Sequence, residues 1–152
     1  MTSSRLVLPA AVRTALLSHA RAGADDGPRE VCGVLAGYRR RGGDESESDC
    51  TDADEVRETH RITNVADDTR VAYELDPAET LATIEAVEDD GLDVVGFYHS
   101  HPETAARPSA TDEARATWTG YVYCIVSPVE ETVRAWRWTG EGFDSMEVVD
   151  SP

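Results

Sequence analysis

The feature that most constrains the fold is an apolar run at residues 93–101, DVVGFYHSH, which ends in two histidines and is followed by a proline. The run is long enough for one buried strand, and Pro102 would stop that strand from pairing further. His99 and His101 occupy alternate positions, so both rings project from the same face, with Cα atoms about 6.5–7 Å apart. The sequence therefore predicts a strand that carries two imidazoles to the end of a sheet.

Helices and further strands are predicted around that run. Residues 9–22 have apolar residues at helical spacing, and a second helix is expected between Asp76, as its N-cap, and Gly91. Apolar or alternating segments favour strands at residues 31–38, 56–65 and 70–75, and three more beginning at residues 121, 132 and 142. We therefore predict an α/β fold in which helices flank a mixed β-sheet whose C-terminal part is an antiparallel meander.

The length of the chain bounds its organisation. A chain of 152 residues suits one domain with one hydrophobic core, and we expect residues 1–152 to form it. Residues 39–58 contain little that can be buried and carry eight acidic residues between Asp44 and Glu58. We expect this segment to be a solvated, flexible loop, with the docking of a basic partner as an alternative.

The charge balance excludes one class of partner. The net charge is −16, and all 14 basic residues are arginine. This composition favours a protein kept soluble in concentrated salt, as in a halophilic archaeon, although an acidic protein from another source is the alternative. Nucleic acid is not expected as a partner, because phosphate binding needs a basic face.

The sequence has no apolar run of 18 residues and no secretory signal. We therefore expect a cytoplasmic protein that does not bind a membrane. The oligomeric state is not predicted.

A carboxylate follows the two histidines at a useful distance. The motif SATD, from Ser109 to Asp112, predicts a short helix over residues 110–118 with Asp112 in its first turn. Two histidines and one carboxylate, with water as fourth ligand, make an open catalytic zinc site. Without the histidines, Ser109 and Asp112 would be interpreted only as a capping box.

The segments GFYHSHP and RPSATD together resemble the JAMM (MPN+) metalloprotease family, which includes deubiquitinating enzymes and archaeal desampylases. Glu30, in EVCGVLAG, matches the upstream glutamate of that family. The resemblance implies the JAMM/MPN fold, an α-β-α architecture similar to that of cytidine deaminases. It also implies one Zn²⁺ per chain, held by His99, His101 and Asp112 with a catalytic water, with Glu30 as general base and Ser109 as a donor to the oxyanion.

The same resemblance implies a substrate. We expect a zinc-dependent isopeptidase that removes ubiquitin-like small archaeal modifier proteins from target lysines by hydrolysis after the C-terminal diglycine. The modifier's tail would lie beside an edge strand at residues 70–75, which makes Val71 and Tyr73 candidate substrate-binding residues unless the segment is an ordinary edge strand. Two alternatives stay open: release of a C-terminal amino acid or peptide from a sulfur-carrier protein, and a non-catalytic MPN-type interaction scaffold.

Overall fold

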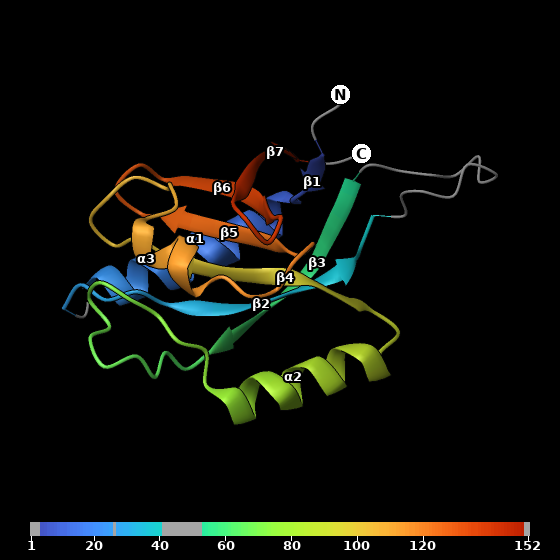
Figure 1. Cartoon of the computed structure of the whole chain (residues 1–152), viewed down its shortest axis with the longest axis horizontal. Helices are drawn as coiled ribbons and strands as arrows, with labels where there is room; N and C mark the ends of the chain where they lie inside the picture. The colour runs from blue at the N-terminus through green and yellow to red at the C-terminus, as the bar shows by residue number, and fades with distance from the viewer. Residues whose placement is uncertain (1–3, 26, 41–52, 151–152) are drawn as a thin grey trace.

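The computed structural model describes residues 4–25, 27–40 and 53–150. Strands and helices alternate along most of the chain (Figure 1). In chain order the elements are β1 (Arg5–Val7), α1 (Ala10–Asp25), β2 (Cys32–Tyr38), β3 (Ala53–Ile62), α2 (Pro77–Asp89), β4 (Asp93–Ser100), α3 (Ala110–Arg115), β5 (Val122–Ser127), β6 (Thr132–Trp138) and β7 (Phe143–Val149). No helix in these ranges is long and apolar enough to span a membrane.

The strands form one mixed sheet that closes on itself in the order β1-β3-β2-β4-β5-β6-β7. The predicted mixed sheet with flanking helices is confirmed, and so is the antiparallel meander of β5, β6 and β7. The closing strand β1 was not predicted. It has three residues and pairs in parallel with both β3 and β7, so its position depends on long-range pairing that a three-residue pattern does not reveal.

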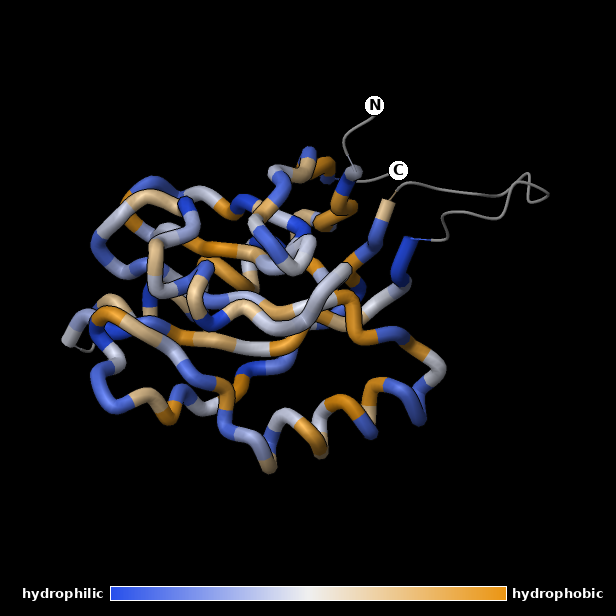
Figure 2. The backbone as a smooth tube through the Cα atoms, viewed as in Figure 1, coloured by the Kyte–Doolittle hydropathy of each residue, from blue (hydrophilic) through white to orange (hydrophobic). Residues whose placement is uncertain are grey.

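Helix α1 packs on one side of the sheet. Its buried residues Val12, Leu16 and Ala20 join a core cluster that includes Val95 and Tyr98 of β4. Figure 2 shows that the central strands are mainly hydrophobic, whereas hydrophobic and hydrophilic residues alternate along α2. This distribution fits a sheet that is covered by side chains on both of its sides.

Helix α2 packs on the other side (Figure 1). Ile84 and Val87 belong to a second cluster with Val94 and Phe97 of β4. The helix starts as predicted, because the Asp76 side chain accepts hydrogen bonds from the first backbone N–H groups. The register with β2 shifts between Val94 and Gly96, and beyond that point Phe97 and Tyr98 face opposite sides of the sheet, so His99 follows Phe97 on the α2 side.

The strand predicted at residues 70–75 is wrong. Arg70 donates its backbone N–H to the Asp68 side chain (3.2 Å), and the N–H groups of Val71 and Ala72 approach the Asp68 carbonyl (3.3 and 3.1 Å). These contacts form a turn, and in this segment only Leu75 forms a β-bridge, with Asn64. Local hydrogen bonds within the turn have therefore replaced the hydrogen bonds to a neighbouring strand that the alternating pattern predicted.

Two other boundaries differ from the prediction. Of the loop expected at residues 39–58, residues 41–52 lie outside the described part of the chain, and residues 53–58 form the first half of β3. The helix expected to reach residue 118 ends at Arg115. The backbone N–H groups of Thr117 and Trp118 donate instead to the Tyr123 hydroxyl (3.2 and 3.0 Å), which draws the chain out of helical geometry.

Candidate metal centre

The end of β4 places the two histidines. Ser100 donates its backbone N–H to the Val31 carbonyl (3.0 Å), and His101 donates its N–H to the Val126 carbonyl of β5 (2.9 Å). The Ser100 hydroxyl also accepts the Val31 N–H (2.9 Å). Neighbouring segments on both sides therefore hold the backbone around residues 99–101. The sequence prediction that His99 and His101 lie together at a strand end agrees with this placement.

The start of α3 places the carboxylate. Ser109 is the N-cap of this helix, and its hydroxyl accepts the Asp112 backbone N–H (3.0 Å). In return, Asp112 Oδ2 accepts the Ser109 N–H (2.9 Å). This reciprocal pair is the predicted capping box, and it fixes the direction of the Asp112 side chain.

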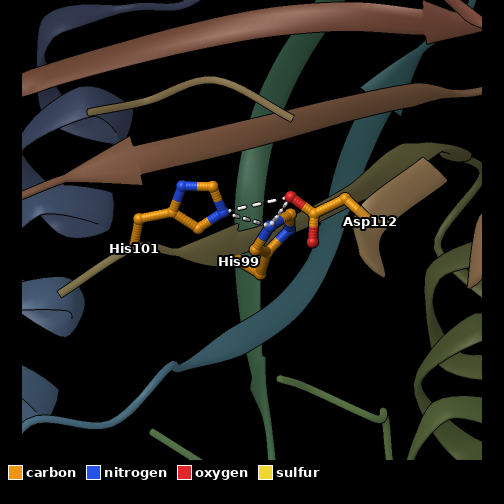
Figure 3. Close-up of side chains that lie close together, drawn as sticks. All are labelled: His99, His101 and Asp112. Atoms are coloured by element: carbon orange, nitrogen blue, oxygen red, sulfur yellow. Dashed lines mark hydrogen bonds and ion pairs between the residues drawn. The ribbon is translucent and has the colours of Figure 1, made fainter. Parts of the chain in front are cut away.

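Three donor atoms converge between β4 and α3 (Figure 3). His99 Nε2 and His101 Nε2 lie 3.2 Å apart, and Asp112 Oδ2 lies 3.2 Å from the first and 3.0 Å from the second. Donors that surround zinc as a tetrahedron with bonds of 2.0–2.1 Å would lie roughly 3.3–3.4 Å from each other. The three atoms therefore already have nearly the spacing that one such ion requires.

The orientation of His101 also suits a metal ligand. His101 Nδ1 donates to the Ala105 carbonyl (2.9 Å), so Nε2 faces Asp112, and these two hydrogen bonds outweigh burial and raise the pKa of the ring. Loss of the Nε2 proton would leave a lone pair for a metal at that atom. His99 is held differently, because its Nδ1 is buried and has no hydrogen-bond partner among the described residues. Burial lowers the pKa of His99, which favours the neutral ring that a metal ligand requires.

Asp112 supplies the negative charge of this group. Its burial opposes ionisation, but hydrogen bonds from His101 and His99 and from the Ser109 backbone hold its pKa well below the usual range. The carboxylate is therefore charged, although only 7% of the residue is exposed. Once His101 has lost its second proton, two imidazoles and one carboxylate form a donor set of the kind that binds zinc in hydrolases.

Glu30 lies beside this group, just before β2. Burial raises the pKa of Glu30 to about 8, and the charges of His101, Asp112 and Arg115 also act on it. Only 6% of the residue is exposed, and Oε1 is buried with no hydrogen-bond partner. A buried carboxyl group of this kind, next to a metal site, can accept and release a proton near neutral pH.

The remaining predicted residues lie in different surroundings. Ser109 is exposed, and the hydrogen bond from Asp112 does not use its O–H proton. Tyr73 stacks on the His99 ring, whereas Val71 is 66% exposed. A groove of about 670 Å³ lies between α2 and α3 and has Tyr73, but not His99, His101 or Asp112, in its lining. Its lining is mainly apolar and includes Tyr73, Leu75, Leu81, Ile84, Phe97 and Trp118.

Sequence reasoning missed Asn64, which anchors the chain next to the site. Its side-chain amide donates to the Glu30 carbonyl (2.9 Å) and to the Ala72 carbonyl (3.1 Å). Asn64 lay inside the strand predicted at residues 56–65, whereas β3 ends at Ile62, so the local pattern gave no signal for the segments that this side chain joins.

Comparison with known proteins assigns the chain to a family. Residues 9–139 match the family described as prokaryotic homologs of the JAB domain. The chain belongs to this family. A desampylase of Haloferax volcanii is 52% identical to this JAB protein over 149 residues, which cover 97% of the chain and 98% of the relative. A CysO-cysteine peptidase of Mycobacterium bovis is 36% identical over 135 residues, which cover 87% of the chain and 82% of the relative.

A solved structure supports the same fold. The solution structure of a protein from Desulfitobacterium hafniense superimposes with a TM-score of 0.78 at 28% identity, covering 95% of this JAB protein and 91% of that chain. Family membership and the buried group of His99, His101 and Asp112 together indicate a metal site.

Proposed function

We propose that this JAB protein is a zinc-dependent isopeptidase that removes ubiquitin-like modifier proteins from target lysines by cleaving after their C-terminal diglycine. The observation that carries the proposal is the converging donor set of His99, His101 and Asp112, beside a groove whose lining residue Tyr73 stacks on His99. The 52% identity to a desampylase over nearly the whole chain supports this substrate class. A cytoplasmic location, one zinc ion per chain and a single domain are parts of the same proposal.

The chain's own residues supply the proton transfers. When bound, zinc activates a water molecule as a nucleophile and polarises the scissile carbonyl. Glu30 accepts the proton of that water at Oε1, which has no competing hydrogen bond. As the water oxygen bonds to the carbonyl carbon and the C–N bond breaks, Glu30 returns the proton to the leaving lysine amine. Ser109 donates a hydrogen bond from its hydroxyl group to the carbonyl oxygen that becomes negative.

The groove suits an extended, slender peptide. Its lining includes Tyr73, which stacks on His99, and also Leu81 and Trp118, which are 60% and 39% exposed. A diglycine has no side chains, so it is the slenderest peptide end that could reach the metal group past Tyr73. The substrate-binding role predicted for Tyr73 fits this placement, and Val71, which is not among the lining residues, has less support.

A second candidate function is release of a C-terminal amino acid from a sulfur-carrier protein. It is favoured by the 36% identity to a CysO-cysteine peptidase over 135 residues. Both reactions use the same hydrolysis after a glycine carbonyl and differ in the leaving amine. A non-catalytic scaffold is disfavoured, because such a scaffold has no need for three intact donor side chains.

The decisive experiment offers the purified protein a modifier joined to a lysine side chain, in molar potassium chloride, and measures product masses. Cleavage directly after the diglycine supports the proposal. The Glu30→Gln variant should bind zinc normally and lose at least about 100-fold in rate, as expected when a general base is removed. Glu103→Gln, which changes an exposed acid near the histidines, is the matched control and should keep full activity.

A parallel assay offers a sulfur-carrier protein with one extra C-terminal amino acid. Faster release from this substrate than from the lysine conjugate would move the assignment to the second candidate. If the zinc-loaded protein cleaved neither substrate, the proposed function would be wrong.

A further inference from the structure

The loop between β3 and α2 places an aromatic ring against one metal-ligand candidate. The rings of Tyr73 and His99 stack with centroids 4.2 Å apart and an angle of 16° between their planes. Within the described residues, this contact is the closest and most nearly parallel of the aromatic pairs. Nearly parallel, close rings restrict rotation about the bonds that orient the imidazole.

The two histidines differ in what orients them. A metal-bound histidine usually donates its second ring nitrogen to an oxygen, which fixes its tautomer and its plane. His101 follows this rule through Nδ1 and the Ala105 carbonyl (2.9 Å). His99 does not, because its Nδ1 is buried without a partner. The plane of the His99 ring therefore needs another support, and the Tyr73 ring covers one face of it.

The backbone around Tyr73 is held firmly enough to give that support. The Asn64 amide uses both of its N–H groups and its oxygen, and it binds the residues on either side of Tyr73. Nδ2 donates to the Ala72 carbonyl (3.1 Å), and Oδ1 accepts the Glu74 N–H (2.9 Å). The second Nδ2 hydrogen bond goes to the Glu30 carbonyl (2.9 Å), so the same amide joins the general-base candidate to this loop.

We propose that Tyr73 is a positioning residue that orients the His99 imidazole for metal binding, with Asn64 holding the Tyr73 backbone in place. The inference rests on the proposed metal site, and it assigns Tyr73 a role that does not require substrate. The face of the ring does the positioning, so the hydroxyl group is dispensable. Burial raises the pKa of Tyr73, so the ring stays neutral at any working pH.

The competing interpretation is that Tyr73 only lines the groove and contacts the modifier's tail. The two roles predict different measurements. A groove residue changes KM and leaves the affinity of the substrate-free protein for metal unchanged. A positioning residue changes metal affinity when no substrate is present.

The test compares Tyr73→Leu, Tyr73→Phe and the matched control Trp118→Leu. Trp118 lines the same groove, and its ring contacts are with Phe97 and Tyr121 rather than with a histidine. Zinc affinity is measured by competition with a chromogenic chelator, and the d–d absorption of the cobalt-loaded protein reports the ligand geometry. Steady-state kinetics then separate kcat from KM.

We expect Tyr73→Leu to bind zinc roughly 3- to 10-fold more weakly and to show an altered cobalt spectrum, as expected for loss of one aromatic stack. Tyr73→Phe should keep both properties, because it keeps the ring. Trp118→Leu should keep metal affinity and raise KM. If Tyr73→Leu fails to fold, Tyr73→Met fills similar volume without a ring face and should show the same loss.

Normal zinc affinity and an unchanged cobalt spectrum in Tyr73→Leu and Tyr73→Met would overturn the inference and leave Tyr73 as a groove residue. A weakened Tyr73→Phe would overturn it as well, because the hydroxyl would then be the active group. These readouts need no substrate. They therefore decide the role of Tyr73 even if the isopeptidase assay fails. Failure of the unsubstituted protein to bind metal would contradict both proposals.

Discussion

Two groups of buried ionisable residues lie near opposite ends of β5, and they differ in how their charges are balanced. Asp54 of β3 and Arg137 of β6 form an ion pair of 2.6 Å, with side chains 0% and 8% exposed. Arg137 lies opposite Val122 at the start of β5, whereas the His101 backbone meets Val126 near the end of that strand. The first group contains one positive and one negative charge and is balanced by itself.

The metal-site group is balanced only by a proton. Asp112 is charged and burial lowers the pKa of His99, but for His101 the hydrogen bonds to Asp112 and to the Ala105 carbonyl outweigh burial and raise the pKa. A proton on His101 therefore offsets the Asp112 charge, and a bound cation would take the place of that proton. A buried charge is costly unless it is paired or coordinates a metal. The Asp54–Arg137 pair therefore needs no ligand to balance its charges, whereas the metal-site group would exchange a proton for a cation on binding metal. Substitutions in the two groups should therefore affect different properties.

The largest expected effect is that of Asp112→Asn. Asparagine keeps an oxygen that can accept the Ser109 N–H, so the helix cap survives, but the negative ligand is lost. We expect zinc binding and activity to fall together, activity by roughly 1,000-fold or more, because the metal contributes several kcal/mol to catalysis. Metal analysis of the purified variant and a cleavage assay measure both.

The control for that variant is Glu113→Gln, which removes the neighbouring exposed acid of the same helical turn. It should change neither property. A chelator should inhibit the unsubstituted protein and this control equally. Full activity of the protein after exhaustive chelation would contradict the metal assignment.

The next effect in size concerns the balanced pair. Arg137→Met leaves Asp54 buried without its partner, which should lower the free energy of unfolding by about 3–5 kcal/mol while zinc affinity stays unchanged. Urea denaturation with and without chelator measures the change. Replacing both residues, with Asp54→Leu added, should restore most of the loss. A double variant as unstable as the single one would show that the pair is not self-contained.

The metal site was more predictable from sequence than the loop that supports it. His99 and His101 are two residues apart, and Asp112 follows within one helical turn of a capping motif, so local geometry brings these side chains together. Tyr73 and Asn64 depend on a turn whose hydrogen bonds run to Glu30, far along the chain. Spacing in the sequence carries no signal for such contacts.

The same reasoning explains the errors in the fold. The helix that begins at residue 110 ends at Arg115 because the Tyr123 hydroxyl accepts hydrogen bonds from the backbone N–H groups of Thr117 and Trp118. The sequence does not reveal this contact with a tyrosine that follows five or six residues later. Strand β1 exists because β3 and β7 offer pairing on both sides. The long helices and the strand with the histidines were predictable because their periodicity and caps are local.

Metal should stabilise the folded state by a smaller amount. With free zinc at about 100 times its dissociation constant, binding to the folded state alone adds about 2.7 kcal/mol to the free energy of unfolding. Thermal denaturation with zinc or with chelator measures this gain. It should be absent in Asp112→Asn and intact in the variant with both Asp54 and Arg137 replaced. Equal stabilisation of Asp112→Asn would place the ion elsewhere.

The smallest expected effect tests a third polar contact, on the other face of β4. The Tyr98 hydroxyl donates to His19 Nδ1 (2.7 Å), and burial, with the charge of Arg61, lowers the pKa of His19 to about 4. Because the unfolded chain binds this proton near pH 6.5, the contact stabilises the fold fully above that pH and loses its contribution as pH falls toward 4. His19 is only half-buried, so we expect a loss of about 1 kcal/mol.

His19→Gln keeps an acceptor for Tyr98 without the titration, so its free energy of unfolding should fall less between pH 6.5 and pH 4 than that of the unsubstituted protein. The exposed His60 provides the control substitution, His60→Gln, and an equal change of slope in that variant would assign the effect to histidine content rather than to the buried contact.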